Sequence, residues 1–262
     1  MSEDLRADLA KLVASVGAYV EWQRETGAAG FPRRPGGAIR APAEIHPPIE
    51  PTPPPAMTPP MVLSAKPDRH VRLPKLASEV AVCKRCALHA TRTQTVFARG
   101  NPDAALCFVG EAPGADEDEQ GLPFVGRAGQ LLDRMIGAMG LVPERDVYVC
   151  NILKCRPPGN RRPEPEETAT CIPYLHEQLA LVNPRVIVAL GNTSVAALLD
   201  TKVAITKMRG VWKLYRGRTL VMPTYHPSYL LRPSGQQAEA KRQVWEDLQL
   251  VMKELGLALP KK

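Results

Sequence analysis

The chain has 262 residues, and its apolar content of 44% predicts a packed core. No run approaches the roughly 18 apolar residues of a membrane span, and the acidic, periodic N-terminus is unlike a signal peptide. These features argue against a membrane or secreted protein and favour a cytoplasmic one, whose net charge of +7 suits polyanionic partners.

Two segments precede the predicted globular domain. Residues 1–25 carry apolar side chains at helical spacing and predict an amphipathic helix, either a weakly packed extension or a docking segment for a protein partner. Residues 26–74 include eleven prolines between Phe31 and Pro60 and predict an extended or disordered linker. We therefore expect one globular domain over residues 75–262, and a monomer.

Strand and helix patterns alternate through that domain. The candidate strands are Ala105–Val109, Val147–Leu153, Val186–Leu190 and Thr219–Met222. The candidate helices are Ala128–Met139, Pro165–Val182, Asn192–Leu199 and Ala238–Leu255. This alternation predicts an α/β fold, a three-layer α/β/α arrangement around a central four-stranded parallel sheet.

Ligands bind at the carboxyl ends of the strands in such sheets. Glu111 follows the first candidate strand, Asn151 lies late in the second, Asn192 follows the third and His226 follows the fourth. A carboxylate, an amide and an imidazole are therefore expected at one rim.

The stretch GEAPGADEDEQGLPFVG, residues 110–126, places five carboxylates within nine residues. Its glycines lack the GxGxxG and GK[ST] patterns, so a nucleotide-binding loop is not predicted. Asp116, Asp118 and Glu119 are expected to be solvated surface acids. Glu111 differs because it directly follows a strand.

Six cysteines suggest metal ligands rather than disulfides in a cytosolic protein. Cys107 and Cys150 lie in candidate strands and are expected in the core. The remaining four are Cys83 and Cys86, which form a CxxC pair, and Cys155 and Cys171. Their spacing favours an iron–sulfur cluster over zinc but leaves both open.

The segment from Thr201 to Ala238 contains no acid and seven bases, which favours a surface that binds a polyanion. The bases are Lys202, Lys207, Arg209, Lys213, Arg216, Arg218 and Arg232. Within this segment HPSYLLR places Tyr229 and Leu230 beside Arg232, and apolar side chains there could wedge into a base stack. We expect Lys213, Tyr229, Leu230 and Arg232 to contact DNA.

The motifs GEAPGADEDEQGLPFVG, NILKCRPPGNRRP and HPSYLLR, with CxxC upstream, resemble those of the family 4 uracil-DNA glycosylases. These are bacterial and archaeal repair enzymes that carry a [4Fe-4S] cluster, and the resemblance covers residues 75–255. Family 5 has an apolar residue where Glu111 stands. A related group that traps uracil-DNA covalently has a histidine in an inserted basic loop, whereas residues 157–165 contain none.

The resemblance implies a role for each matching residue. The [4Fe-4S] cluster would be structural and bound by the four cysteines at 83, 86, 155 and 171. Glu111 matches the catalytic carboxylate, and His226 matches the histidine of the second catalytic motif. The substrate-binding positions are Gly110, Ala112, Glu117, the base-stacking Phe124 and the uracil-recognising Asn151.

The expected function is therefore to flip uracil out of DNA and hydrolyse its N-glycosidic bond, leaving an abasic site for base excision repair. One alternative is a non-catalytic iron–sulfur DNA-binding protein that joins the replication machinery through its N-terminal extension. A small electron-transfer protein is a third hypothesis, which fits the cysteines but leaves the basic segment unexplained.

Overall fold

A computed structural model describes residues 68–233 and 235–259. The expected N-terminal helix over residues 1–25 and most of the linker over residues 26–74 lie outside this range. The first described helix, α2 (Arg69–Ala81), begins inside the range assigned to the linker, with Asp68 accepting a hydrogen bond from the His70 backbone N–H at its N-cap.

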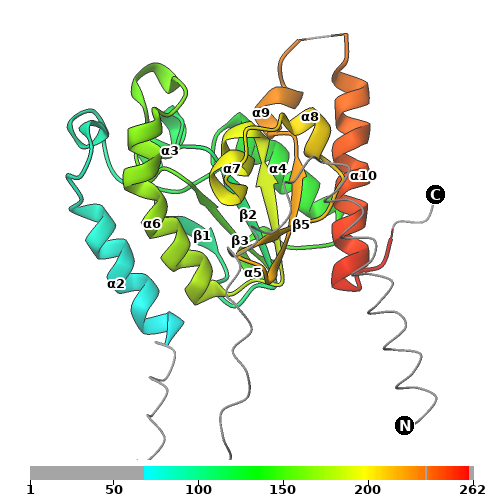
Figure 1. The fold of residues 1–262 in the computed structure, drawn as a ribbon, viewed down its shortest axis with the longest axis horizontal. Coiled ribbons are helices and arrows are strands. Elements are labelled where there is room, and N and C mark those ends of the chain that lie inside the picture. The colour runs from blue at the N-terminus through cyan, green and yellow to red at the C-terminus, as the bar shows by residue number, and fades with distance from the viewer. Residues whose placement is uncertain (1–67, 234, 260–262) are drawn as a thin grey trace, which may run out of the picture. The chain divides into compact units, whose positions relative to one another are not determined.

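The domain is built on one six-stranded sheet with the order β1-β3-β2-β4-β6-β5 (Figure 1). Its strands are β1 (Ala98–Gly100), β2 (Leu106–Gly110), β3 (Val147–Asn151), β4 (Val186–Leu190), β5 (Lys213–Tyr215) and β6 (Thr219–Thr224). The four central strands are parallel, as the sequence predicts. The edge strands β1 and β5 pair antiparallel and were not predicted.

Helices cover both faces of the sheet, which confirms the three-layer α/β/α class. They are α3 (Ala115–Gln120), α4 (Arg127–Ala138), α5 (Pro143–Asp146), α6 (Pro165–Val182), α7 (Gly191–Leu199), α8 (Ile205–Met208), α9 (Pro227–Leu230) and α10 (Gln237–Leu255), with 3-10 turns at Ala87–Ala90 and Pro158–Asn160. In Figure 1, α2 and α6 run along one side of the sheet and α10 along the other.

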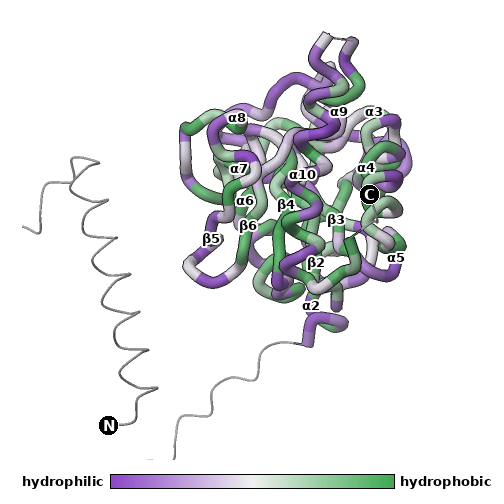
Figure 2. The backbone as a smooth tube through the Cα atoms, turned by 90° about the vertical axis from the view of Figure 1, so that its right-hand side faces the viewer, coloured by the Kyte–Doolittle hydropathy of each residue, from purple (hydrophilic) through white to green (hydrophobic). Residues whose placement is uncertain are grey.

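Alternate side chains of each central strand enter two separate cores. In β2, Leu106 and Phe108 pack toward α4 and α10, whereas Cys107 and Val109 pack toward α2, α6 and α7. All five residues of β2, β3 and β4 are buried, and Figure 2 shows the hydrophobic residues gathered in these strands. Burial on both faces explains why these strands are continuous apolar runs in the sequence.

Within the described ranges, no helix combines the length and the apolar composition that crossing a membrane would require.

Candidate active site

A cleft of about 730 Å³ lies at the carboxyl ends of the parallel strands. Nine of the residues that the sequence places at this edge or in the site line it: Glu111, Ala112, Glu117, Phe124, Asn151, Asn192, His226, Tyr229 and Arg232. Because β2, β3, β4 and β6 all end at this edge, the topology brings together side chains that are more than 100 residues apart. The volume of the cleft lies within the ~300–1,000 Å³ typical of ligand sites.

Glu111 directly follows β2, and hydrogen bonding fixes its backbone but not its carboxylate. Its carbonyl oxygen accepts a hydrogen bond from the Leu153 N–H at 3.0 Å, which extends the pairing of β2 with β3 by one step. The carboxylate forms no hydrogen bond or ion pair with any residue in the described ranges and borders the cleft. It is therefore available to a water molecule or a substrate.

Asn151, the last residue of β3, is 2% exposed, and its Oδ1 atom is buried without a hydrogen-bond partner among the described residues. An unpaired buried carbonyl costs about 1–3 kcal/mol. Since Asn151 lines the cleft, the natural partner is a donor on a molecule that enters it.

Phe124 stands next to this amide in an unusual backbone conformation, with φ at 58°. Left-handed φ values are uncommon for a bulky residue, so the surrounding structure must hold it. Arg99 on β1 does so in part: its Nε donates to the Pro123 carbonyl at 2.9 Å, and its guanidinium pairs with Asp133 on α4. Gly129 also contributes, because a Cβ there would lie 1.8 Å from the Phe124 carbonyl oxygen.

Glu117 lines the cleft, but its carboxylate organises the loop around it. Oε2 accepts a hydrogen bond from the Gly114 N–H at 2.9 Å, and Oε1 accepts from the Val125 and Gly126 N–H groups at 3.0 and 2.9 Å. These bonds cap α3 and tie it to the loop that carries Phe124.

The expectation of uniformly solvated acids in this stretch is wrong for Asp118. Its side chain is 3% exposed, and both oxygens accept the Thr93 N–H at 3.0 Å. Asp116 and Glu119 are exposed, as expected. The acidic run forms the first turns of α3, where negative side chains favourably meet the positive end of the helix dipole.

His226 follows β6 and caps the short helix α9. Its Nδ1 accepts the Ser228 N–H at 3.1 Å and lies 2.8 Å from the Ser228 hydroxyl, which leaves the proton on Nε2 when the ring is neutral. The ring centroid lies 5.6 Å from that of Phe124. Burial, with a smaller contribution from Arg232, lowers the pKa of His226 to about 4.

We expect the imidazole of His226 to remain neutral at pH 6, with its proton on Nε2, and to titrate near pH 4. Because its pKa lies below the usual value of about 6.5, the unfolded chain binds this proton first, and the residue disfavours folding as the pH falls through that window. Titration of isotope-labelled histidine by NMR, with His226→Gln to assign the signal, measures both the pKa of His226 and the ring nitrogen that carries its proton. Protonation near pH 6.5 would contradict this placement.

Three arginines border the cleft without an ion-pair partner among the described residues: Arg127, Arg162 and Arg232. The sequence predicted only Arg232. Arg127 begins α4 directly after the loop of Phe124, and Arg162 lies in the loop between Cys155 and Cys171. Their cationic side chains at the rim suit phosphate groups.

The neighbouring apolar residues divide between rim and core. Tyr229 is 38% exposed and packs against Tyr225, with the ring centroids 5.1 Å apart and the ring planes tilted by 43°. Leu230 is only 2% exposed and belongs to the core between the sheet and α10. The expected insertion of Leu230 into DNA is therefore wrong for this conformation, because its side chain already packs inside the protein.

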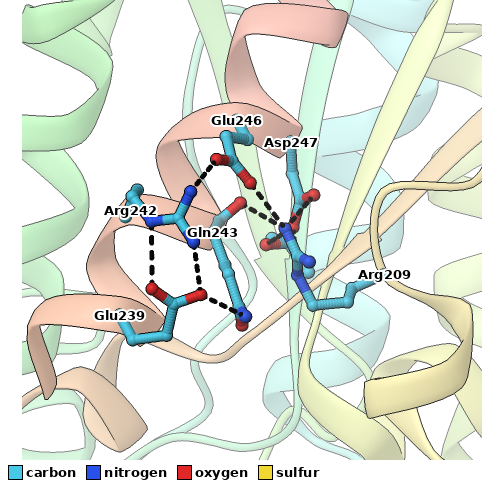
Figure 3. A network of polar contacts seen from close by, with 7 residues as sticks. Arg209, Glu239, Arg242, Gln243, Glu246 and Asp247 are labelled. Atoms are coloured by element: carbon cyan, nitrogen blue, oxygen red, sulfur yellow. Dashed lines mark hydrogen bonds and ion pairs between the residues drawn. The ribbon is translucent and has the colours of Figure 1, made fainter. Parts of the chain in front are cut away.

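The basic segment is not one continuous surface. Arg209 pairs with the buried Asp247 on α10 at 2.6 Å (Figure 3). Asp247 also accepts a hydrogen bond from the Thr224 hydroxyl at 2.6 Å. The Arg209 guanidinium lies 5.8 Å from the centre of the Tyr225 ring. Arg209 therefore supports the turn that precedes His226 instead of facing a ligand.

Other bases of this segment lie away from the cleft. Arg216 and Arg218 occupy the turn between β5 and β6, where Tyr215 pairs with Thr219 at the opposite end of β6 from His226. Lys213 pairs with Val221 on the sheet edge and does not line the cleft. The prediction of a single DNA surface from these residues is wrong, because the hairpin carries them to the other end of the sheet.

A second, much smaller cavity, of about 20 Å³, is lined by all four cysteines that the sequence selects as ligands: Cys83, Cys86, Cys155 and Cys171. Arg85, Arg92 and Lys154 also line it, and no carboxylate of the described part of the chain does. Arg92 Nη1 donates to the Cys155 sulfur at 3.1 Å.

The other two cysteines, Cys107 and Cys150, are fully buried core residues on β2 and β3, as predicted. Among the described residues, no three His, Cys, Asp or Glu side chains are grouped so as to hold a single metal ion. The four thiols thus share a cavity lined with cations without forming the compact set that one zinc ion, at about 2.3 Å from each sulfur, requires.

Comparisons with known proteins match this description. The family model described as "Uracil DNA glycosylase superfamily" matches residues 97–249, which include every residue of the cleft named above. A type-4 uracil-DNA glycosylase from Thermotoga maritima is 49% identical over 179 residues, covering 68% of this chain and 92% of that protein. A type-4 uracil-DNA glycosylase from Sulfurisphaera tokodaii is 46% identical over 168 residues, covering 61% and 76%.

A more distant relative is the type-5 uracil-DNA glycosylase of Pyrobaculum aerophilum, 34% identical over 146 residues that cover 50% of this chain and 64% of that protein.

Proposed function

This chain belongs to the uracil DNA glycosylase superfamily and, within it, to the type-4 enzymes, and we propose that it removes uracil from DNA through the side chains of its cleft. The reaction hydrolyses the N-glycosidic bond and leaves an abasic site, the first step of base excision repair. One observation carries the residue assignment: the cleft holds together a carboxylate and a buried amide oxygen that have no partner within residues 68–233 and 235–259.

Asn151 recognises the base in this proposal. The N3–H of uracil supplies the donor that Oδ1 lacks, and the amide NH₂ donates to uracil O4. Cytosine presents an acceptor at N3 and a donor at its amino group, so both groups of the amide would lose their partners. Sites built on such pairs discriminate strongly, because an unmatched base leaves buried polar groups unpaired.

Phe124 and His226 form the walls of the base pocket. A uracil inside a duplex is inaccessible, so the nucleotide must be flipped into the cleft. Stacking on an aromatic ring is worth about 1–3 kcal/mol per base. Phe124 is only 5% exposed but, unlike Leu230, it lines the cleft, so the part of its ring that borders the cleft would stack on the base.

Gly110 is required for this pocket because a Cβ at that position would lie 2.3 Å from Asn151 Oδ1 and 2.4 Å from Phe124 Cζ. Gly110→Ala should therefore displace both groups and slow uracil release by about 100-fold, as ångström-scale misplacement does. The matched control is Gly137→Ala in α4, where a Cβ meets nothing within 4 Å. Single-turnover rates measure both, and a wild-type rate for Gly110→Ala would refute the pocket.

In the chemical step, opposite charges develop at the two ends of the breaking N-glycosidic bond, and a different side chain stabilises each. Negative charge develops on the departing uracil, and positive charge develops on the sugar in an oxocarbenium-like transition state. The neutral His226 can donate its Nε2–H to the uracil oxygen that gains charge. Glu111 can orient a water molecule and offset the charge of the sugar.

The four cysteines that line the small cavity would hold the [4Fe-4S] cluster, and three observations support the fit. The thiols share one cavity, basic side chains line it with them, and none of the described carboxylates lies there to compete. The cluster would supply structural cross-linking: it would join the loop after α2, the segment after β3 and the first half of α6.

DNA would contact the rim of the cleft through Arg127, Arg162 and Arg232, with Tyr229 beside the flipped nucleotide. Lys213 lies on the sheet edge, so it would contact DNA only if the DNA extends beyond the cleft. Acting as a monomer on chromosomal DNA, the protein would work in a bacterial or archaeal cytoplasm. Neutralising phosphates makes such binding fall with salt.

Incubation with a uracil-containing oligonucleotide followed by alkali tests the function. Strand breaks at the uracil position, and none at cytosine or thymine in matched oligonucleotides, are the expected result. Intact uracil DNA with an iron-loaded protein would overturn the enzyme assignment and favour a DNA-binding protein without catalysis.

A further inference from the structure

Lys154 is a buried lysine that contacts a residue of the cleft and also lines the cysteine cavity. Its side chain is 1% exposed, and it belongs to the short segment between Asn151 and Cys155. Its Nζ atom donates to the backbone carbonyl of Asn151 at 2.7 Å and also donates to Gln178 Oε1 on α6. Lys154 at the same time lines the cavity of the four cysteines.

The segment around Lys154 is fixed to the active-site strand. The Ile152 and Leu153 N–H groups donate to the carbonyl oxygens of Gly110 and Glu111, each at 3.0 Å, and the Lys154 carbonyl accepts the Val96 N–H at 2.8 Å. The backbone next to Asn151 is thus fixed by hydrogen bonds to the end of β2, and the Asn151 carbonyl itself is fixed by the amino group of Lys154.

Apart from its two hydrogen-bond acceptors, the buried amino group of Lys154 lies 5.8 Å from the centre of the Phe97 ring. Both of its acceptors are neutral, and no carboxylate of the described residues pairs with it. Burying an unpaired charge is costly, and an apolar side chain of equal length would fill the same space at lower cost. The four thiols of the adjacent cavity would be deprotonated when they bind metal and would then offset a positive charge on Lys154.

We propose that Lys154 is a positioning residue: from its place beside the four cysteines it fixes the backbone of Asn151, and thereby the position of the amide that recognises uracil. This inference rests on the proposed function. Through its hydrogen bond to the Asn151 carbonyl, the amino group of Lys154 contributes to base recognition in addition to any contribution to stability.

The test measures binding in a background that is expected not to cleave, Glu111→Gln, with iron content determined for every sample. Affinities are compared for an oligonucleotide with one uracil and the same oligonucleotide with cytosine. Adding Lys154→Met removes the donor but keeps the length of the side chain. The control is Tyr148→Phe, which removes a hydroxyl that bonds to Gln178 in the same buried network but touches neither cavity.

Lys154→Met should lower the preference for uracil over cytosine by about tenfold, the loss expected for one positioned hydrogen bond to a charged group. Iron content and affinity for the cytosine oligonucleotide should stay unchanged, and Tyr148→Phe should keep the full preference. An unchanged preference in iron-loaded Lys154→Met would overturn the proposal. Equal losses of affinity for both oligonucleotides would also overturn it, because they indicate a structural role alone.

If Lys154→Met does not fold with iron bound, Gln178→Met provides the second arm, since it removes the other acceptor that fixes the ammonium. It should also reduce the uracil preference, and an unchanged preference there would contradict the proposal. The Glu111→Gln parent separates the two claims. If the parent shows no uracil preference, the proposed base recognition fails; if the parent prefers uracil and the double variants do too, only the role of Lys154 fails.

Discussion

Glu111→Gln should lower the single-turnover rate of uracil release by about 10²–10⁴-fold, the range expected for loss of a positioned acid–base group. The glutamine has the same shape but cannot offset the charge of the sugar or accept a proton from water. Affinity for uracil-containing DNA should remain, because Asn151, Phe124 and the rim arginines are untouched.

The control for this variant is Glu119→Gln, which removes a carboxylate from the same acidic run. Glu119 is exposed on α3 and does not line the cleft, so its variant should cleave at the wild-type rate. A wild-type rate for Glu111→Gln, or an equal loss in both variants, would refute the catalytic role of Glu111.

The second large effect is expected at Asn151. Asn151→Ala should reduce uracil release by about 100-fold or more, since it removes both an acceptor for N3–H and a donor for O4. The loss should be specific to base recognition: binding of an abasic oligonucleotide, which has no base to recognise, should be unchanged. Rates and abasic-site affinities measured side by side check this, and a loss of abasic binding equal to the loss of rate would contradict it.

The central fold follows from the sequence because its signals are local and strong. β4 and α6 have the bounds that the sequence predicts. β4 is an uninterrupted apolar run that begins with three β-branched residues, and α6 begins with a proline that follows a capping glutamate. The edge strands β1 and β5 have three residues each and little apolar periodicity, so no local pattern distinguishes them from loops.

The site is only partly predictable for a different reason. Strand ends and the order of strands suffice to bring Glu111, Asn151 and His226 to one edge. The burial of Leu230, the pairing of Arg209 with Asp247 and the ammonium of Lys154 depend on contacts across the fold. In the sequence, a buried lysine or leucine beside a motif is indistinguishable from an exposed one.

The acidic stretch illustrates both cases. The position of Glu111 follows from the strand that precedes it, but the structural roles of Glu117 and Asp118 do not. Those two carboxylates accept backbone N–H groups that come from their own loop and from Thr93. Such bonds are a property of the folded loop geometry, which composition does not encode.

A crystal structure of Glu111→Gln bound to uracil-containing DNA is the most direct test of the account. We expect the uracil to be flipped into the cleft, stacked on Phe124, with its N3 atom within hydrogen-bond distance of Asn151 Oδ1 and one of its oxygens facing His226 Nε2. A uracil held in the cleft with Asn151 Oδ1 still unpaired, or bound outside the cleft altogether, would contradict it.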